Sequence, residues 1–315
     1  SSRTPLRMPK ILKIDTPADY SAFLGAEQPH PLVCLIEFER IGPIRHSLNA
    51  YGVYGIFLQE RNGLDLTYGC GKYDYRDGSL ICVAPGQIGG KEENGEKVEI
   101  GGWALLFHPD ILRGTSLQQE IAGYSFFDYR VNEALHMSPD EHRVVVDIFR
   151  AMEAEIAKSH DDFQDEIIVG YISLLLRFCQ RFYHRQFLTR RIANNDILAR
   201  FNTFLRDYFA DGRQQEDGIP SVSLCADALH MSPNYFSDLI RKTTGESAGT
   251  YIRRFVIARA KDELAAGLSV SEVAYRLGFE YPQHLSRMFK KGTGVTPKAV
   301  SYTHLRAHET LANLV

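Results

Sequence analysis

Short apolar runs separated by turn residues fill the first third of the chain after a polar start. Each run is rich in β-branched or aromatic side chains and is too short for a buried helix, which is typical of a β-strand. Gly, Pro, Asn and Asp fall between the runs at short intervals and favour antiparallel hairpins closed into a small barrel or sandwich. The predicted strands are 32–36, 51–58, 80–84 and 103–107.

The apolar spacing then becomes helical. Ser138 followed by Pro139 predicts an N-cap and the first residue of a helix. A second helix over 167–182 is apolar on more than one side, because two leucines fall off its main stripe. We interpret the additional apolar surface of this helix as a face that packs against the barrel. The alternative interpretation is that it forms a subunit interface. We expect a homodimer formed through residues 139–184.

Polar and turn-forming residues cluster at 194–196 and again at 211–218. We interpret the first cluster as the mark of the boundary between two domains. The fold class expected is therefore α+β and multidomain, with a front domain over 1–190 that joins an antiparallel β-barrel to helices. An all-α domain over 191–299 follows.

The last hundred residues contain an internal repeat. The pattern Val-Ser-x-x-Ala-x-x-Leu occurs at 222–229 and returns at 270–277, an offset of 48. After one inserted residue, Gly245 returns as Gly294, an offset of 49. Each copy predicts a short helix, a turn and a second helix, which is the plan of a helix-turn-helix unit. The predicted helices are 224–229 and 233–242 in the first copy, and 270–277 and 282–291 in the second.

Local signals agree with these boundaries. Ser232 precedes Pro233 as an N-cap, and Ser269 with Glu272 forms a capping box. A continuous helix over 249–264 joins the two copies. Its length of about 25 Å is suited to holding two recognition helices about one DNA turn apart, roughly 34 Å.

Apolar residues at i, i+3 and i+4 of each second helix are expected to face the core, which leaves a polar opposite face. Amide and guanidinium groups can hydrogen-bond to base edges, and cations at helix ends can bind phosphates. The base-reading candidates are Asn234, Ser237, Asp238, Gln283, His284 and Arg287. The phosphate candidates are Arg241, Lys242, Lys290 and Lys291. A solvated helix surface is the alternative for each residue alone, and the repetition of the whole unit favours DNA binding.

Charge is divided unevenly along the 315 residues, although the net charge is only -3. Residues 241–299 hold eleven Lys and Arg against five Asp and Glu, whereas the chain before Arg241 holds 24 basic and 33 acidic residues. The back segment therefore carries +6 and suits a polyanionic partner such as double-stranded DNA.

Ordered matches to one known family run through the repeat. They are MSPNYF at 231–236, RKxxG at 241–245, YI at 251–252, ARAK at 258–261, VxxVAxxLGF at 270–279 and FKKxxGVTP at 289–297. On these matches residues 196–299 resemble the double helix-turn-helix DNA-binding domain of AraC/XylS-type transcription regulators. The resemblance implies transcription regulation, RNA polymerase as a possible partner, and a front domain that senses an effector and dimerises, often a cupin-like barrel with appended helices.

Two parts of the chain depart from the family pattern. After Pro297 the expected aromatic residue and Arg are missing, and 302–310 resembles translated sequencing-adapter sequence, so we expect 300–315 to be a non-native tail. Catalytic cupins hold a divalent metal with a His-x-His pair, a Glu and a later His. The corresponding stretch at 68–73 contains no His, and so we predict neither a metal nor a cofactor.

A barrel without a metal can still bind a small-molecule effector between aromatic walls. The candidate pocket residues are Tyr51, Tyr54, Tyr68, Tyr73 and Trp103. Three isolated histidines, His30, His46 and His108, are interpreted as loop or hydrogen-bonded residues. Five cysteines without C-x-x-C spacing are interpreted as buried thiols rather than disulfides or zinc ligands. These are Cys34, Cys70, Cys82, Cys179 and Cys225.

No apolar run is long enough for a membrane span, and the first residues lack the apolar core of a signal peptide, so we expect a cytoplasmic protein. No G-x-S-x-G, H-E-x-x-H or P-loop motif occurs, and we predict a regulator rather than an enzyme. Two alternatives stay open. They are a cupin-class enzyme with a DNA-binding appendage and a DNA-binding protein that needs no ligand.

Overall fold

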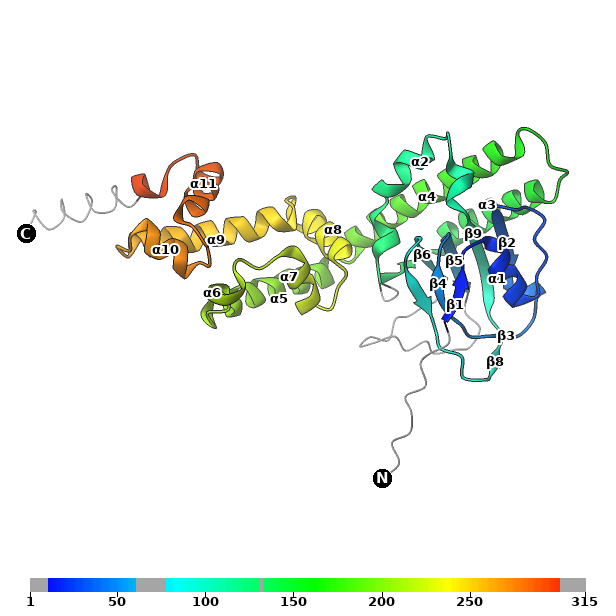
Figure 1. The fold of residues 1–315 in the computed structure, drawn as a ribbon, viewed down its shortest axis with the longest axis horizontal. Coiled ribbons are helices and arrows are strands. Elements are labelled where there is room, and N and C mark those ends of the chain that lie inside the picture. The colour runs from blue at the N-terminus through cyan, green and yellow to red at the C-terminus, as the bar shows by residue number, and fades with distance from the viewer. Residues whose placement is uncertain (1–10, 61–77, 131–132, 301–315) are drawn as a thin grey trace, which may run out of the picture. The chain divides into compact units, whose positions relative to one another are not determined.

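The computed structural model describes residues 11–60, 78–130 and 133–300, and the chain divides into two compact units, Ser1–Thr189 and Arg190–Val315 (Figure 1). The first unit combines sheets with helices, and the second is helical within its described part. No helix in these described ranges has the length and apolar character needed to cross a membrane.

A five-stranded sheet is the largest element of the first unit, with strand order β10-β6-β5-β9-β2. Its strands are β2 (Val33–Glu37), β5 (Tyr54–Glu60), β6 (Ser79–Val83), β9 (Gly101–Phe107) and β10 (Leu135–His136). All neighbouring strands are antiparallel. Every residue of β9 is buried, because this strand lies between β5 and β2 and both of its faces are covered.

Two smaller sheets complete the described strands. One has the order β1-β4-β7 and consists of Ile11–Ile14, Leu48–Tyr51 and Ile88–Gly90; the other pairs β3 (Ile44–Arg45) with β8 (Lys97–Val98). The pairing of β1 with β4 is parallel, which corrects the expectation of antiparallel hairpins throughout. Because none of the three described sheets closes on itself, the predicted barrel is not confirmed.

One apolar cluster of the first unit combines residues of the three-stranded and the five-stranded sheet. Ala104 and Leu106 of β9 contribute to it from one face, since side chains alternate along a strand. The buried members are Ile14, Tyr20, Cys34, Ile36, Phe38, Tyr51, Val53, Ala104 and Leu106. The other face of β9 meets a helix, where the Trp103 ring stacks on Phe149 with centroids 5.7 Å apart.

The helices of the first unit confirm the predicted start and extend the predicted lengths. Ser138 accepts a hydrogen bond from the Glu141 N–H, and the Glu141 carboxylate accepts one from the Ser138 N–H, so the helix begins at Pro139 as expected. The helices are α1 (Pro17–Leu24), α2 (Leu117–Glu120), α3 (Pro139–Ile156) and α4 (Gln164–Thr189), with short 3₁₀ turns η1 (Phe38–Arg40), η2 (Pro109–Leu112), η3 (Ile121–Gly123) and η4 (Ser125–Asp128).

The second compact unit begins with a helix that contains the polar cluster at 194–196. Asn194, Asn195 and Asp196 lie inside α5 (Arg191–Ala210). These residues are poor helix formers, but Phe201 and Leu205 further along α5 are fully buried, and burial outweighs propensity. The remaining helices are α6 (Gln214–Asp217), α7 (Val222–Ala228), α8 (Pro233–Thr244), α9 (Ala248–Ala265), α10 (Val270–Arg276) and α11 (Pro282–Thr293).

Candidate nucleic-acid interface

The first helix-turn-helix unit consists of α7, a turn and α8. Ser232 caps α8 by accepting a hydrogen bond from the Tyr235 N–H at 3.2 Å, and Pro233 follows as the first helical residue, as predicted. Phe236, expected in the core, is fully buried and meets the ring of Phe201 edge to face, with centroids 4.9 Å apart. In the turn, His230 has φ 60°, a left-handed conformation that costs a residue other than glycine about 1 to 2 kcal/mol.

The second helix-turn-helix unit repeats this geometry with α10 and α11. The predicted capping box is present between Ser269 and Glu272, and its hydrogen bonds lower the pKa of the Glu272 carboxyl. The turn residue equivalent to His230 is Gly278, with φ 86°. A Cβ at this position would lie 2.3 Å from the Gln214 carbonyl oxygen, so both the backbone angle and the close approach require glycine.

One helix, α9, connects the two helix-turn-helix units (Figure 1). Its buried residues Ile252, Val256 and Ala260 follow one another at intervals of four and so share one side of the helix. Val256 and Ala260 belong to the same apolar cluster as Leu285 and Phe289, which fixes α11 against α9. The predicted framework of two helix-turn-helix units joined by one continuous helix is confirmed.

The polar faces of α8 and α11 differ in how far their side chains are exposed to solvent. Asn234, Ser237 and Asp238 on α8 are half-buried, and Asn234 and Asp238 already interact within the chain. Arg241 and Lys242 are exposed at the end of α8, although Lys242 also has an intramolecular partner.

The polar face of α11 is exposed to solvent. Its five candidate side chains, Gln283, His284, Arg287, Lys290 and Lys291, are all exposed. The His284 ring contacts Tyr281 edge to face at 5.5 Å, and this exposed tyrosine immediately before α11 was not singled out from the sequence. An exposed aromatic residue gives no sequence signal that separates it from a core residue.

Comparison with known proteins agrees with this geometry. The helix-turn-helix domain family matches residues 225–301. The second unit contains an AraC-type helix-turn-helix domain. A transcriptional regulatory protein of Bacillus subtilis, YesN, itself uncharacterized, is 38% identical over 88 residues, which are 26% of this chain and 24% of YesN. The HTH-type transcriptional activator RhaS of an Enterobacter species is 27% identical over 186 residues, 58% of this chain and 60% of RhaS.

Among solved structures, the C-terminal domain of AraT, a response regulator from Geobacillus stearothermophilus, is 26% identical, with 34% of this chain and 84% of that chain covered and a TM-score of 0.30. The match spans less than two thirds of the length of the two curated relatives, YesN and RhaS.

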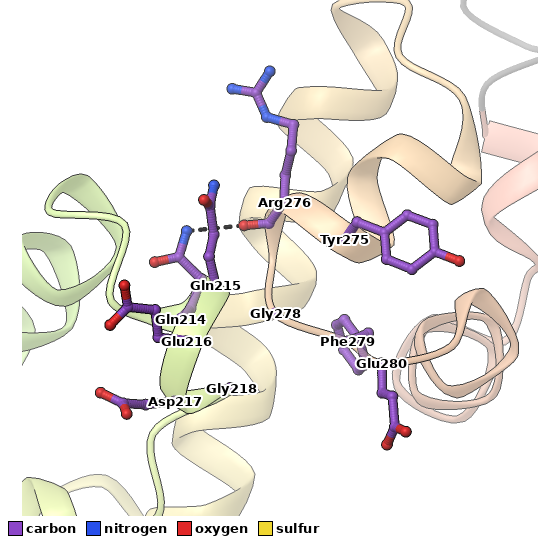
Figure 2. Close-up of a pocket in the computed structure, with 10 residues that line it drawn as sticks. All are labelled: Gln214, Gln215, Glu216, Asp217, Gly218, Tyr275, Arg276, Gly278, Phe279 and Glu280. Carbon is purple, nitrogen blue, oxygen red and sulfur yellow. Dashed lines mark hydrogen bonds between the residues drawn. The ribbon is translucent and has the colours of Figure 1, made fainter.

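A pocket of about 730 Å³ lies within the AraC-type domain, beside the turn between α10 and α11 (Figure 2). Its walls come from Gln214–Gly218 and from Tyr275, Arg276, Gly278, Phe279 and Glu280. The Gln214 amide donates a hydrogen bond to the Arg276 carbonyl oxygen at 2.8 Å, which joins α6 to the end of α10. Glu216, Asp217 and Glu280 are exposed here, and their charge opposes phosphate. Because Arg276 is the one cation among the lining residues, the charge here is less favourable to a phosphate than that of the exposed face of α11.

The three effector-pocket candidates that the structure describes, Tyr51, Tyr54 and Trp103, have different surroundings. Tyr51 lies in the apolar cluster that combines residues of the two sheets, and its hydroxyl accepts a hydrogen bond from the Asn49 side-chain amide at 3.1 Å. Tyr54 stacks on Phe107 with centroids 5.2 Å apart. Trp103 is buried against α3 on the other face of β9. Tyr68 and Tyr73 lie outside the described residues.

The interpretation of cysteines as buried thiols is confirmed for the four that the structure describes, Cys34, Cys82, Cys179 and Cys225. Burial raises the pKa of the Cys34 thiol to about 11 and that of Cys225 to about 12, so both are protonated and unreactive near neutral pH. Cys70 lies outside the described residues. His108 has the structural role expected at a strand end, since its Nδ1 accepts a hydrogen bond from the Asp110 N–H at 3.1 Å.

Proposed function

We propose that this protein is a DNA-binding transcription regulator that reads a specific site through its AraC-type domain. The observation that carries this proposal is the pair of helix-turn-helix units, of which the second presents an exposed cationic and polar helix face. Since its target is chromosomal DNA, we expect the protein in the cytoplasm.

The two recognition helices have unequal roles in this proposal. On α11, Gln283, His284 and Arg287 read bases, and Lys290 and Lys291 bind phosphates. On α8, Asn234, Ser237 and Asp238 are base-reading candidates, and Arg241 and Lys242 bind phosphates. Because the α8 candidates are half-buried and partly engaged, α11 contributes the larger share of sequence discrimination. The 18 residues of α9, about 27 Å, suit insertion of both helices into successive major grooves on one side of the duplex.

Selection of genomic fragments by the full chain tests sequence specificity. We expect the recovered fragments to share one motif, and binding to that motif, followed by fluorescence anisotropy, to weaken steeply between about 50 and 200 mM salt as counterions are released. Fragments without a shared motif would contradict site-specific regulation, and salt-independent binding would contradict the phosphate contacts.

Dimerisation through α3 and α4 is a separate proposal. Phe163 and, on α4, Ile167 and Leu174 are 66%, 41% and 44% exposed, large values for apolar side chains. Half-buried Tyr171 and Phe178 continue the same helical stripe. An isologous contact between two copies of the stripe would remove this apolar surface from water.

Control by a small-molecule effector bound in the first unit is also a proposal, as is a contact with RNA polymerase. A thermal-shift screen of the full chain against sugars, aromatic metabolites and metals tests the effector, since a ligand of the folded state raises the melting temperature by mass action. A regulator that needs no ligand predicts no shift with any compound, and turnover of a stabilising compound would favour the cupin-class enzyme.

A further inference from the structure

We propose that His30, His160 and Asp165 form a binding site for a zinc-like divalent transition metal in the first unit. One ligand atom from each of the three side chains can be chosen so that all lie within 4.8 Å of one another. His30 comes from the loop before β2, His160 from the turn between α3 and α4, and Asp165 from the first turn of α4. The inference does not depend on the proposed DNA binding.

The donor set determines the class of metal. Two imidazoles and one carboxylate suit Zn²⁺ and its neighbours, whereas Mg²⁺ and Ca²⁺ prefer sites made of oxygen atoms. Zinc sites with three protein ligands leave a fourth position for water or another ligand. Because His160 is exposed, an ion can reach this site from solvent.

His160 is already oriented for this role by a buried glutamine. The Gln164 side-chain amide donates to the Glu155 carbonyl oxygen at 2.8 Å, so its oxygen is left to accept a hydrogen bond from Nδ1 of His160 at 2.9 Å. This arrangement places the imidazole proton on Nδ1 and leaves the Nε2 lone pair for a metal. Metal-binding histidines are commonly oriented by such a partner at the second nitrogen.

His30 and Asp165 lie closer together than metal ligands would. Nε2 of His30 donates a hydrogen bond to the Asp165 carboxylate at 2.8 Å. Two donors of a tetrahedral zinc ion lie about 3.4 Å apart at bond lengths of about 2.1 Å. Metal binding therefore replaces the proton between them, with a small separation of the pair and an inward movement of the His160 side chain.

Binding also has a cost at the other nitrogen of His30. Nδ1 accepts a hydrogen bond from the Leu32 N–H at 3.2 Å. When Nε2 binds the metal, the ring proton moves to Nδ1 and this hydrogen bond is lost. We therefore expect weaker zinc binding than at sites whose second imidazole nitrogen already donates a hydrogen bond, and a change in the Leu32 amide resonance when zinc is added.

Calorimetric titration of the metal-free full chain with Zn²⁺ tests the site, with Mg²⁺ as the comparison ion. We expect one Zn²⁺ per chain from this site and no comparable binding of Mg²⁺. His160→Gln and Asp165→Asn should each weaken Zn²⁺ binding at least about tenfold, as the loss of even an indirect metal partner usually does. Neither variant should unfold the protein, because His160 is exposed and asparagine can still accept the His30 hydrogen bond.

His184→Gln is the matched control, since His184 is an exposed histidine on α4 outside the cluster. His304 and His308 are present in every variant, so any zinc that they bind cancels in the comparison. Co²⁺ titration provides an independent measurement, because four-coordinate Co²⁺ absorbs visible light far more strongly than the hydrated ion, and this absorption should be lost in His160→Gln. Zinc affinity and Co²⁺ absorption that are the same in His160→Gln, Asp165→Asn and wild type would overturn the proposal.

Discussion

At the scale of single residues, Arg287 and Lys291 are both exposed cations on α11 but are placed for different tasks. Arg287 follows Gln283 by one helical turn on the face opposite the buried Leu285 and Phe289. Lys291 lies near the end of the helix, where it can meet a phosphate rather than a base edge.

We expect Arg287→Ala to weaken binding to the selected site by about 1 to 3 kcal/mol while changing non-specific binding little, because a guanidinium can pair with guanine through two hydrogen bonds. Lys291→Ala should weaken binding to all sequences alike and lower the salt slope by about one. Competition binding on selected and scrambled duplexes measures both effects. Equal proportional losses in the two variants would show that Arg287 is only another phosphate contact.

The two turn residues His230 and Gly278 provide a second comparison at this scale, on stability rather than binding. Both have positive φ, but only at Gly278 would a Cβ collide with another backbone atom, the Gln214 carbonyl oxygen. Gly278→Ala should lower the free energy of unfolding by about 2 to 4 kcal/mol, through the left-handed backbone and the collision together.

His230→Gly should change the free energy of unfolding by less than about 1 kcal/mol, because relief of the left-handed strain offsets the greater freedom of glycine in the unfolded chain. Urea unfolding of both variants and wild type measures the difference. A loss for His230→Gly as large as that for Gly278→Ala would mean that the His230 side chain stabilises the first turn by contacts of its own.

At the scale of elements, α4 has an apolar stripe that its own unit leaves exposed. Ile167→Glu and Leu174→Glu should shift the full chain from dimer to monomer in sedimentation at tens of micromolar, about the range of a weak interface, because each places a carboxylate in the contact. Gln180→Glu is the control, since it adds the same charge at an exposed position on the other side of α4. A wild-type chain that sediments as a monomer, or variants that remain dimeric, would contradict dimerisation through this helix.

At the scale of the whole molecule, charge is divided unevenly along the chain, and the division at Arg241 lies inside the second compact unit. Residues 241–299 carry a balance of +6, and the chain before Arg241 carries -9. A fragment that covers 190–300 keeps α5, whose Phe201 packs on Phe236, together with α6 to α11. We expect this fragment to bind duplex DNA without the first unit and with strong salt dependence. Anisotropy titrations at about 50 and 200 mM salt measure this, and a fragment that folds but does not bind would show that the first unit is required.

The sequence by itself determined the framework of the AraC-type domain. Serine caps, proline at the first helical position, glycine after the helix end and apolar spacing of i, i+3 and i+4 are signals carried by neighbouring residues, so α7 to α11 follow the predicted boundaries closely. The repeat added to these signals, because two copies of one pattern support each other.

Only the tertiary structure decided which distant residues meet. It paired β1 with β4 in parallel, continued α5 through Asn194–Asp196, and placed Tyr51 and Trp103 on opposite sides of β9. It also brought His30 to Asp165 across 135 positions of sequence. The reason is physical: local backbone preferences depend on adjacent residues, whereas side-chain contacts depend on the path of the whole chain and on which apolar faces exclude water together.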